Sequence, residues 1–389
     1  MKHLKQITGT VCRQQFVANF VVDDSSVGNK IDAKQLIETM VTRIMIECSF
    51  GQSFTAADAA VDFDRFRQSV PKFDQNRRLL LWTLLWPQLI DPVFRLYDKL
   101  FGGRQRYFID SVRKLVEQRR RRQLMATTTT TTADADNDNN KDFLQIFIDY
   151  RHNKSITNSS SNSLTVDEII SLFYVSFMSA YEPLTLMLAM SVYELARNPR
   201  IQQKLYDELV ANSKRSSSIG GGDSGNNGST DLSDLPYLNA VLMETMRKYP
   251  AIVTNRRATQ DIHLPDIGVT VPKGTDVELS FISMYYNPQY FPDPLVYNPD
   301  RFMPESADKL TRHSFMPFGS GQVLYCVGER FAKLLMKHVL SALVVWLEFR
   351  PSATTAAVAA GTEKMSNQFK QFPDLLLPKS VDIEYKFRL

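Results

Sequence analysis

The segment from Ile169 to Tyr193 constrains the fold of this chain most, because it is strongly apolar and Glu182 is its only charge. Its length alone would permit a membrane-spanning helix. However, Glu182 and Pro183 lie in its middle, and a carboxylate at the centre of a bilayer is costly. A helix buried on all sides in a large protein has the same composition. We therefore expect a central core helix here, with a membrane-spanning helix as the alternative.

Size and charge place the chain among globular proteins. Its 389 residues are enough for one large core or two average domains, and 43% of them are hydrophobic. A formal net charge of +4 gives no broad signal for nucleic-acid binding, so we expect no nucleic-acid partner. The three cysteines are far apart and odd in number, which argues against a disulfide framework and favours a reducing, cytosol-facing environment.

Apolar periodicity predicts a mainly helical protein. Helices are expected over residues 33–48, 107–120, 142–150, 167–197, 199–211, 234–248 and 328–349. Between residues 252 and 281 the pattern changes to short strands and tight turns. Three low-complexity stretches interrupt the helical pattern without ending it, so we expect surface loops of one domain over residues 1–389: 126–140, 158–163 and 213–230. The expected fold class is mainly α with small β-sheets.

A cysteine follows a glycine-rich run near the C-terminal end. Phe318-Gly319-Ser320-Gly321 would let the backbone approach a flat cofactor, and Cys326 follows at the start of the last expected helix. The helix N-terminus stabilises a thiolate, and a soft thiolate on a tight loop suits the iron of a haem. Taken alone, a cysteine in this position is more often an ordinary buried cysteine at a helix start.

Glu244 and Arg247 form a second pattern, because they stand at i and i+3 on one face of an expected helix. Apolar neighbours predict that this helix is largely buried. A buried ion pair left half-made costs roughly 3–5 kcal/mol, so a further partner is needed. Arg301, in Asn298-Pro299-Asp300-Arg301-Phe302, is the candidate.

Taken in order, these motifs resemble those of the cytochrome P450 haem-thiolate monooxygenases. The chain has Glu-x-x-Arg at Glu244 and Arg247, then Pro-x-Arg-Phe at Arg301, then Phe-Gly-x-Gly and Cys-x-Gly around Cys326. Other family-like segments occur in the expected order at residues 193–199, 234–238 and 271–274, and Ser49-Phe50-Gly51 is similar to the animal microsomal group that contains subfamily 3A. The resemblance implies the cytochrome P450 fold.

The resemblance also implies roles for individual residues. Cys326 would be the axial ligand of haem b, with Phe318, Gly319 and Gly328 shaping the cysteine loop. Arg256 would pair a haem propionate through a charge-assisted bond; a solvated arginine at a strand edge is the alternative. The role of Glu244, Arg247 and Arg301 would be structural.

The central helix departs from the family pattern. Ser179-Ala180-Tyr181-Glu182-Pro183 keeps the small residue at Ala180 and the acid at Glu182, both expected catalytic positions. The family's threonine is replaced by Pro183, which can kink a helix but cannot supply the hydroxyl that helps to deliver protons. Thr185 would point elsewhere on the helix.

Two further departures concern the cysteine loop and the N-terminus. Four residues, 322–325, separate the second glycine from Cys326 where the family has three including an arginine, and a misplaced exon boundary is one explanation. An N-terminal anchor, a proline-rich hinge and a Trp-x-x-x-Arg helix are not found, so we expect a chain that is incomplete at its N-terminus.

The resemblance implies partners as well. These are cytochrome P450 reductase carrying electrons from NADPH, cytochrome b5, and an apolar small molecule as substrate, at the cytosolic face of the endoplasmic reticulum membrane. The Leu- and Trp-rich segment Leu79–Arg95 would touch the membrane, or else pack in the core. Arg330, Lys333 and Lys337 would face the reductase, or form a solvated basic face.

Three functions follow from these features. The first is a monooxygenase. The second is a haem-thiolate isomerase or dehydratase of peroxides, which would need no threonine at position 183. The third is an inactive cytochrome P450-like protein that binds haem poorly or not at all, which the missing propionate ligands favour. A multi-pass membrane protein is a more distant alternative.

Overall fold

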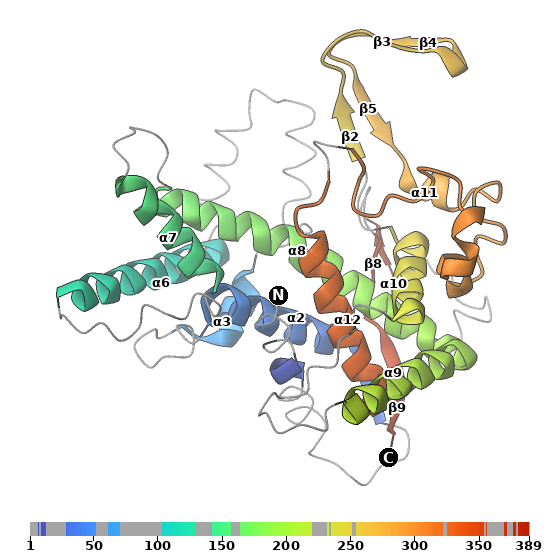
Figure 1. Cartoon of the computed structure of the whole chain (residues 1–389), viewed down its shortest axis with the longest axis horizontal. Helices are drawn as coiled ribbons and strands as arrows, with labels where there is room; N and C mark the ends of the chain where they lie inside the picture. The colour runs from blue at the N-terminus through green and yellow to red at the C-terminus, as the bar shows by residue number, and fades with distance from the viewer. Residues whose placement is uncertain are drawn as a thin grey trace. The chain divides into compact units, whose positions relative to one another are not determined.

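The computed structural model is mainly helical and describes residues 7, 9–12, 29–51, 61–70, 103–128, 142–156, 164–219, 232, 235–250, 254–321, 325–353, 355, 369–371, 376–378 and 380–388. Its longer helices, shown in Figure 1, are α2 (Ala33–Phe50), α6 (Gly103–Thr128), α7 (Phe143–Ile156), α8 (Val166–Arg197), α9 (Pro199–Ile219), α10 (Pro236–Lys248) and α12 (Glu329–Trp346). Shorter turns of helix are α3 (Phe63–Ser69), α11 (Phe281–Tyr285), η5 (Pro265–Ile267), η6 (Pro299–Phe302) and η7 (Pro304–Lys309).

The strands form small antiparallel sheets. A three-stranded sheet has the order β1-β9-β6, from β1 (Asn29–Asp32), β9 (Asp382–Phe387) and β6 (Leu347–Pro351). The two-stranded pairs are β2 (Thr254–Arg257) with β5 (Asp276–Leu279), β3 (Ile262–Leu264) with β4 (Val269–Val271), and β7 (Phe369–Gln371) with β8 (Leu376–Pro378). The fold class is therefore the predicted one, mainly α with small β-sheets.

The chain divides into two compact units. The first contains Met1–Val22 and Ile37–Thr185, and the second contains Asp23–Leu36 and Leu186–Leu389. α8 contributes its N-terminal half to the first unit and its C-terminal half to the second. The single domain expected from the sequence stays a prediction.

α8 is the apolar helix that the sequence predicts. It begins with a capping box, in which the Glu168 backbone N–H donates to Thr165 Oγ1 (3.2 Å) and the Thr165 N–H donates to Glu168 Oε2 (2.5 Å). The cap is thus Thr165, and Asp167 in the first turn pairs with Arg113 at 2.8 Å. The helix continues across Pro183. Within the described part of the chain, α8 is the one helix long and apolar enough to cross a membrane, although half of its apolar window is buried in the protein.

An aromatic cluster forms the core of the first unit. Phe50 at the end of α2, Phe66 in α3 and Phe108 in α6 meet Phe173 and Phe177 of α8, with ring centroids 4.9 to 6.2 Å apart. Such tilted, edge-on and stacked pairs add about 0.5–1.5 kcal/mol each beyond the area they bury. The five rings explain why α8 is apolar over its first half.

Arg119 of α6 joins three elements of the same unit. It donates to Asp142 Oδ2 (2.8 Å), Gln145 Oε1 (3.0 Å) and the carbonyl of Phe50 (3.2 Å). Asp142 also caps α7 by accepting from the Gln145 N–H at 2.8 Å, as its position before the helix predicts. Gly51 follows α2 with φ +53°, and a Cβ there would come within 2.8 Å of Asp142 Oδ2. Only glycine therefore fits between α2 and α7.

In the second unit, α10 has no capping side chain of its own. Glu208 of α9 accepts from the backbone N–H groups of Tyr237 and Leu238, both at 2.8 Å. A carboxylate at a helix N-terminus is favoured by the free N–H groups and by the helix dipole. The N-terminal cap of α10 is thus supplied by a residue about thirty positions earlier in the chain.

Several ends of the predicted elements differ from the structure. α6 and α9 extend to Thr128 and Ile219, so the first residues of the expected loops 126–140 and 213–230 are helical. The last helix was expected to reach Phe349 but ends at Trp346, and Leu347 begins β6. Gln202 accounts for the change, because its side chain accepts from the Phe349 N–H (2.8 Å) and donates to the Phe349 carbonyl (3.0 Å). These bonds, with the pairing of β6 to β9, satisfy the backbone as a strand.

Several predictions lie outside the described residues. They concern the membrane-facing role of Leu79–Arg95, most of the expected surface loops, and positions 322–324 of the altered cysteine loop.

The cap from Glu208 can be tested directly. We expect Glu208→Ala to lower the free energy of unfolding by about 1–2 kcal/mol, because two N–H groups at the start of α10 lose their acceptor. Urea unfolding followed by circular dichroism measures the change. The control is Asp207→Ala, since Asp207 is exposed and accepts from the Gln203 side chain in the preceding turn of its own helix. Equal losses in the two variants would contradict the role of the cap.

Candidate haem-thiolate site

The loop that carries Cys326 is fixed by its backbone. The Cys326 N–H donates to the carbonyl of Phe318 at 2.9 Å, and the Cys326 carbonyl accepts from the Glu329 N–H at 3.2 Å. Gly319 has φ +82°, a conformation that favours glycine, and its N–H donates to Met316 at 3.0 Å. A Cβ on Gly328 would contact the Cys326 sulfur at 3.8 Å. Phe318 and Gly319 are thus brought next to Cys326 and Gly328.

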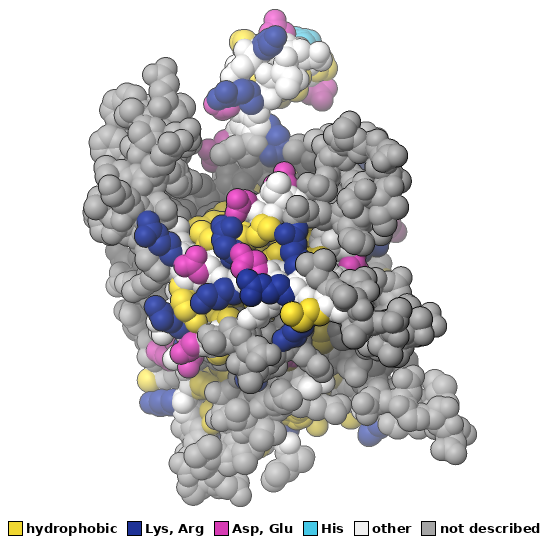
Figure 2. Space-filling view, turned by 90° about the vertical axis from the view of Figure 1, so that its left-hand side faces the viewer, with side chains coloured by type: hydrophobic (Ala, Val, Ile, Leu, Met, Phe, Trp, Pro, Cys, Tyr) yellow, Lys and Arg dark blue, Asp and Glu magenta, His cyan; other side chains and the backbone are white. Residues whose placement is uncertain are grey.

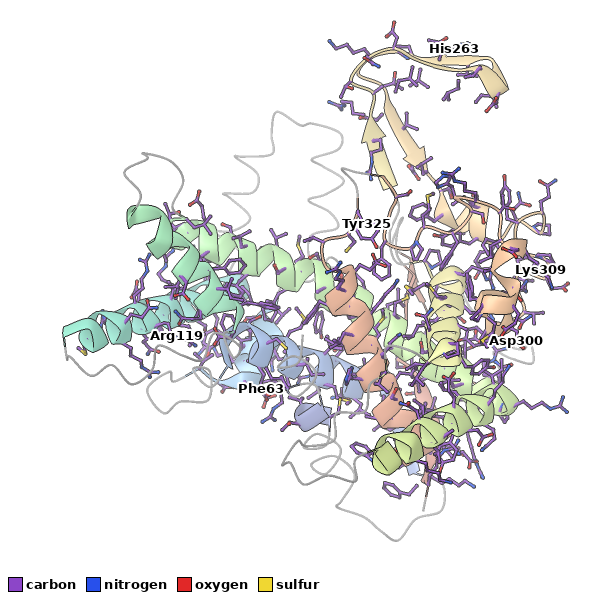
Figure 3. All side chains as sticks on the ribbon, in the orientation of Figure 1. Phe63, Arg119, His263, Asp300, Lys309 and Tyr325 are labelled. Atoms are coloured by element: carbon purple, nitrogen blue, oxygen red, sulfur yellow. The ribbon has the colours of Figure 1, made fainter. Side chains whose placement is uncertain are left out.

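Cys326 does not stand inside the last helix. α12 starts at Glu329 with Gly328 as its N-cap, two residues after the cysteine. Tyr325, labelled in Figure 3, lies in the same short segment before α12 and is 58% exposed. Cys326 therefore belongs to the segment that leads into the helix, and its side chain is exposed.

The three cysteines differ in burial, and this singles out Cys326. Burial raises the pKa of the Cys12 thiol to about 12. Burial, together with the charge of Glu47, does the same for Cys48. Neither forms an appreciable thiolate at neutral pH. Cys326 is exposed, so it is the thiol that a cofactor can reach.

Glu244 and Arg247 form a fully buried ion pair on α10. Arg247 Nε donates to Glu244 Oε2 at 2.8 Å and Nη2 donates to Oε1 at 2.9 Å, with both side chains 0% exposed. Arg301 Nε lies 3.6 Å from Glu244 Oε1, so the structure places the three predicted partners together. Arg301 also donates to the Asp293 carbonyl at 2.8 Å.

The remaining donors of Arg247 go to the backbone. Nη1 donates to the Tyr285 carbonyl at 3.0 Å, and Nη2 donates to the Pro294 carbonyl at 2.9 Å. Glu244 Oε1 in turn accepts from the Asn298 N–H at 2.9 Å. The pair therefore holds the irregular segment after α11 in place, a role that the sequence did not indicate.

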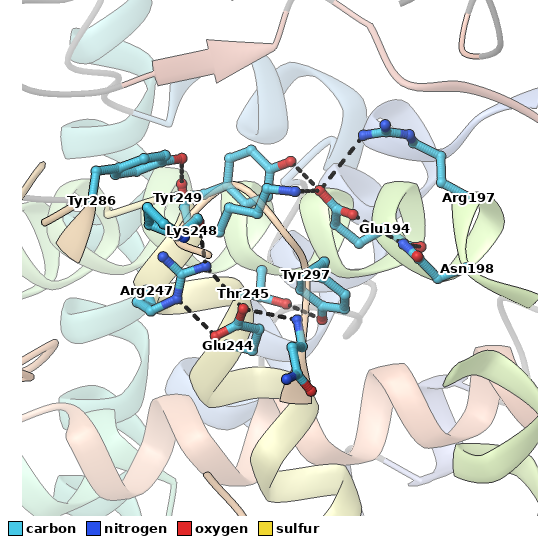
Figure 4. Close-up of polar contacts among 12 residues, drawn as sticks. Glu194, Arg197, Asn198, Glu244, Thr245, Arg247, Lys248, Tyr249, Tyr286 and Tyr297 are labelled. Carbon is cyan, nitrogen blue, oxygen red and sulfur yellow. Dashed lines mark hydrogen bonds and ion pairs between the residues drawn. The ribbon is translucent and has the colours of Figure 1, made fainter. Parts of the chain in front are cut away.

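A second buried ion pair involves Lys248 at the end of α10, one turn after Glu244 (Figure 4). Glu194 of α8 is 1% exposed and lies 2.8 Å from Lys248 Nζ. It also accepts from the Tyr249 hydroxyl and, at 3.2 Å, from the Asn198 side chain. Burial, and then the charge of Glu194, hold the pKa of Tyr249 well above its usual value. Sequence analysis missed this cluster, although an isolated acid in an apolar helix was a signal for it.

Arg256 lies in β2 opposite Val277 of β5 and is half-buried. Its neighbour Arg257 points to the other face of this pair of strands, where it forms an exposed bidentate pair with Asp276 (2.7 and 2.9 Å). The two adjacent arginines are thus in different surroundings. The role of Arg256 toward a propionate stays a prediction.

Glu182 and Ala180 belong to the first unit. Glu182 is buried, at 6% exposure, and Ala180 is half-buried. Tyr181 between them is also buried, and desolvation raises its pKa, with a further rise from the nearby charge of Glu38. Thr185 is 3% exposed and its hydroxyl has no hydrogen-bond partner.

Basic side chains on α12 are not all turned to solvent. Lys333 Nζ lies 2.6 Å from Glu329 Oε1, and Lys337 donates to the Leu232 carbonyl at 3.3 Å. Arg330 is exposed. On the face drawn in Figure 2, Lys and Arg side chains alternate with Asp and Glu. That face therefore does not present a patch of a single sign.

Comparison with known proteins decides the family. The family model for cytochrome P450 matches residues 12–363, which is most of the chain. This chain belongs to the cytochrome P450 family. The match extends from α2 to beyond α12, so it includes both the α10 ion pair and the Cys326 loop.

Individual relatives come from insects and mammals. The chain is 27% identical to a probable cytochrome P450 6a13 of Drosophila melanogaster, covering 84% of this chain and 61% of the relative. It is 26% identical to cytochrome P450 3A31 of Mesocricetus auratus, covering 87% and 63%. It is 31% identical to cytochrome P450 6d1 of Musca domestica over 54% and 43%. The likeness to the 3A group is thus present and is matched by that to the insect proteins. The chain spans about three fifths of the length of the first and second of these relatives.

The residues on the cysteine loop fit a haem. The loop offers one exposed thiol with a glycine beside the sulfur, which leaves room for a flat group. Among the described residues, no group of three or more His, Cys, Asp and Glu is arranged to hold a bare metal ion. Haem iron needs only one such ligand, because the porphyrin supplies four nitrogens.

The buried pair on α10 gives a test of the scaffold. We expect Glu244→Ala to cost roughly 3–5 kcal/mol, because it leaves Arg247 charged and buried without its carboxylate. Guanidinium unfolding measures the loss. Asp276→Ala is the matched control, since it breaks an equally close bidentate pair whose side chains are 70% and 67% exposed. Solvent screens that pair, so the control should change little, and a comparable loss would contradict the importance of burial.

Proposed function

We propose that this cytochrome P450 chain acts as a haem-thiolate monooxygenase on an apolar small molecule, with O2 as oxidant and electrons delivered from NADPH by a reductase. The observation that carries the proposal is the exposed Cys326 thiol, held by two backbone hydrogen bonds in a glycine-containing turn. Haem b bound there supplies the oxygen activation. The protein's own part is to orient the group and to exclude water.

Each predicted site residue has a part in this proposal. Cys326 Sγ would hold the haem iron, and the Phe318 carbonyl fixes the cysteine by accepting from its N–H. Gly319 and Gly328 keep the loop close to the group. Arg256 would pair a propionate, and a charge-assisted bond of this kind is about twice as strong as a neutral one.

Glu182 and Ala180 are proposed to act at the site where O2 would bind. Ala180 leaves space, and Glu182 places a carboxyl group in a buried part of α8 as the candidate for proton transfer. Pro183 has no hydroxyl, so any proton that reaches Glu182 must be handed on by water or by substrate. Glu244, Arg247 and Arg301 are proposed as structural residues that do not touch substrate.

Partners and location follow from the family. We propose cytochrome P450 reductase and cytochrome b5 as electron donors, the cytosolic face of the endoplasmic reticulum as location, and peripheral membrane contact through Leu79–Arg95. We also propose that residues 1–389 belong to one cytochrome P450 domain.

Pro183 favours a second candidate function. A haem-thiolate isomerase or dehydratase of peroxides receives its oxygen already reduced, so it needs no hydroxyl at this position to deliver protons. Turnover of a fatty-acid hydroperoxide without NADPH would support it, and strict dependence on NADPH and reductase would exclude it. The lengthened cysteine loop favours the third candidate, an inactive family member.

The ligand assignment predicts that Cys326→Ala abolishes the thiolate-specific Soret band of the reduced carbon monoxide complex. Cys48→Ala is the control, because its buried thiol has a pKa of about 12 and should leave the band in place. An unchanged spectrum in Cys326→Ala would rule out the assignment. Absence of the band in the parent protein would favour the inactive member.

Chemical labelling supplies a second measurement for the same assignment. In the haem-free protein, iodoacetamide near neutral pH should modify Cys326 and leave Cys12 and Cys48 unmodified until the chain is unfolded. Added haem should protect Cys326. Labelling of Cys326 at the same rate with and without haem would contradict ligation.

Pro183→Thr tests the oxygen chemistry. If the chain is a monooxygenase weakened by the missing hydroxyl, this change should raise the fraction of NADPH that is coupled to product by about tenfold, a modest share of what a positioned proton donor contributes. Thr185→Ala is the control, because its buried hydroxyl lies two residues on and has no hydrogen-bond partner. No gain in Pro183→Thr, together with NADPH-free peroxide turnover, would favour the isomerase.

A further inference from the structure

Lys333 of α12 is turned back onto the cysteine loop. Its Nζ lies 2.6 Å from Glu329 Oε1 and 5.4 Å from the centroid of the Phe318 ring. The second distance is within the range of a cation–π interaction. The side chain is 31% exposed, so the ammonium is held between a carboxylate and a ring and is only partly in water.

Both partners of Lys333 also contact Cys326. Phe318 accepts from the Cys326 N–H at 2.9 Å, and the Glu329 N–H donates to the Cys326 carbonyl at 3.2 Å. Each of the two backbone bonds that hold the cysteine therefore involves a residue that Lys333 touches. The ammonium thus has a fixed position next to the ligand loop.

The charge of the Glu329 carboxylate is compensated by this lysine. The Glu329 side chain is 12% exposed, and Oε2 is buried without a hydrogen-bond partner, so Lys333 is the compensation that its carboxylate receives at Oε1. Its place in the first turn of α12 adds a favourable interaction with the helix dipole. Charges in such a partly dry site act more strongly on a neighbouring charge than they would in water.

We propose that Lys333 and Glu329 are a fixed charge pair that tunes the one-electron reduction potential of the haem held by Cys326. Reduction adds one electron from the reductase, and a nearby cation stabilises the added negative charge while a carboxylate opposes it. Lys333 is thus a positioning residue for electron uptake, acting through Phe318 and the cysteine loop. The inference rests on the proposed haem site and goes beyond it, because it gives an internal role to a lysine that would otherwise serve as a reductase contact.

The experiment uses the full chain loaded with haem and measures midpoint potentials by spectroelectrochemical titration with redox mediators. Lys333→Met should lower the ratio of reduced to oxidised haem at a fixed potential by about tenfold, which is 59 mV for one electron. Glu329→Gln should shift the potential the other way. Lys333→Arg keeps the cation and should stay near the parent value, and the double variant Lys333→Met with Glu329→Gln should return toward it.

The matched control is Lys337→Met, one turn further along α12, whose Nζ donates to the Leu232 carbonyl. Its potential should stay at the parent value. Equal shifts in Lys333→Met and Lys337→Met would overturn the proposal, because they would report net charge and not the fixed pair.

Two other outcomes separate the possibilities. Unchanged potentials in all variants, with a normal thiolate Soret band, would overturn the tuning role and leave the proposed haem site standing. In that case, slower reduction by reductase in Lys333→Met would identify a docking lysine. Failure of the parent chain to bind haem would overturn the proposed function and this inference together. If Lys333→Met loses haem by misfolding, the upward shift in Glu329→Gln still decides the question.

Discussion

The ion pair between Glu244 and Arg247 is the interaction on which the second unit depends. Two charges with 0% exposure are tolerable only when every donor and acceptor finds a partner. The partners found here are mainly backbone groups, the carbonyls of Tyr285 and Pro294 and the N–H of Asn298. An irregular stretch with few regular hydrogen bonds of its own is thereby fixed to a rigid helix. The Pro-x-Arg-Phe segment comes directly after that stretch in the chain, and the residues that lead to the cysteine loop come after it.

α10 gains its rigidity from both ends. At its start the carboxylate of Glu208 takes two free N–H groups, and at its end Lys248 meets Glu194 at 2.8 Å. The two acids come from α9 and α8, so α10 is clamped by neighbours and not by its own capping residues. Carboxylate at the N-terminus and ammonium at the C-terminus are also the arrangement that the helix dipole favours. A helix held in this way can carry a buried ion pair without fraying.

The cysteine loop combines a fixed backbone with exposed side chains. Its backbone is held by Phe318 and Glu329, while its side chains at Tyr325, Cys326 and Val327 are exposed. Rigidity of the backbone with openness of the thiol is what a ligand loop needs, because the sulfur must reach a group that the polypeptide does not provide. Lys333 and Glu329 add a pair of opposite charges next to this loop.

Periodicity and motif order in the sequence determined the class of fold, the helical positions, the Glu244–Arg247 pair and the choice of Cys326. These are local features, since an i, i+3 pair or an apolar stripe depends only on helical geometry. Tertiary structure decided which cysteines are buried, that Glu208 and not a local residue caps α10, that Gln202 holds Leu347–Phe349 as a strand, and that Lys333 lies over the Phe318 ring. Each of these depends on a contact between distant segments or on desolvation. Neither effect produces a periodic pattern that could be recognised in the sequence. Buried charges such as Glu194 belong to the same group, because the sequence shows an acid but not the lysine and tyrosine that the fold brings to it.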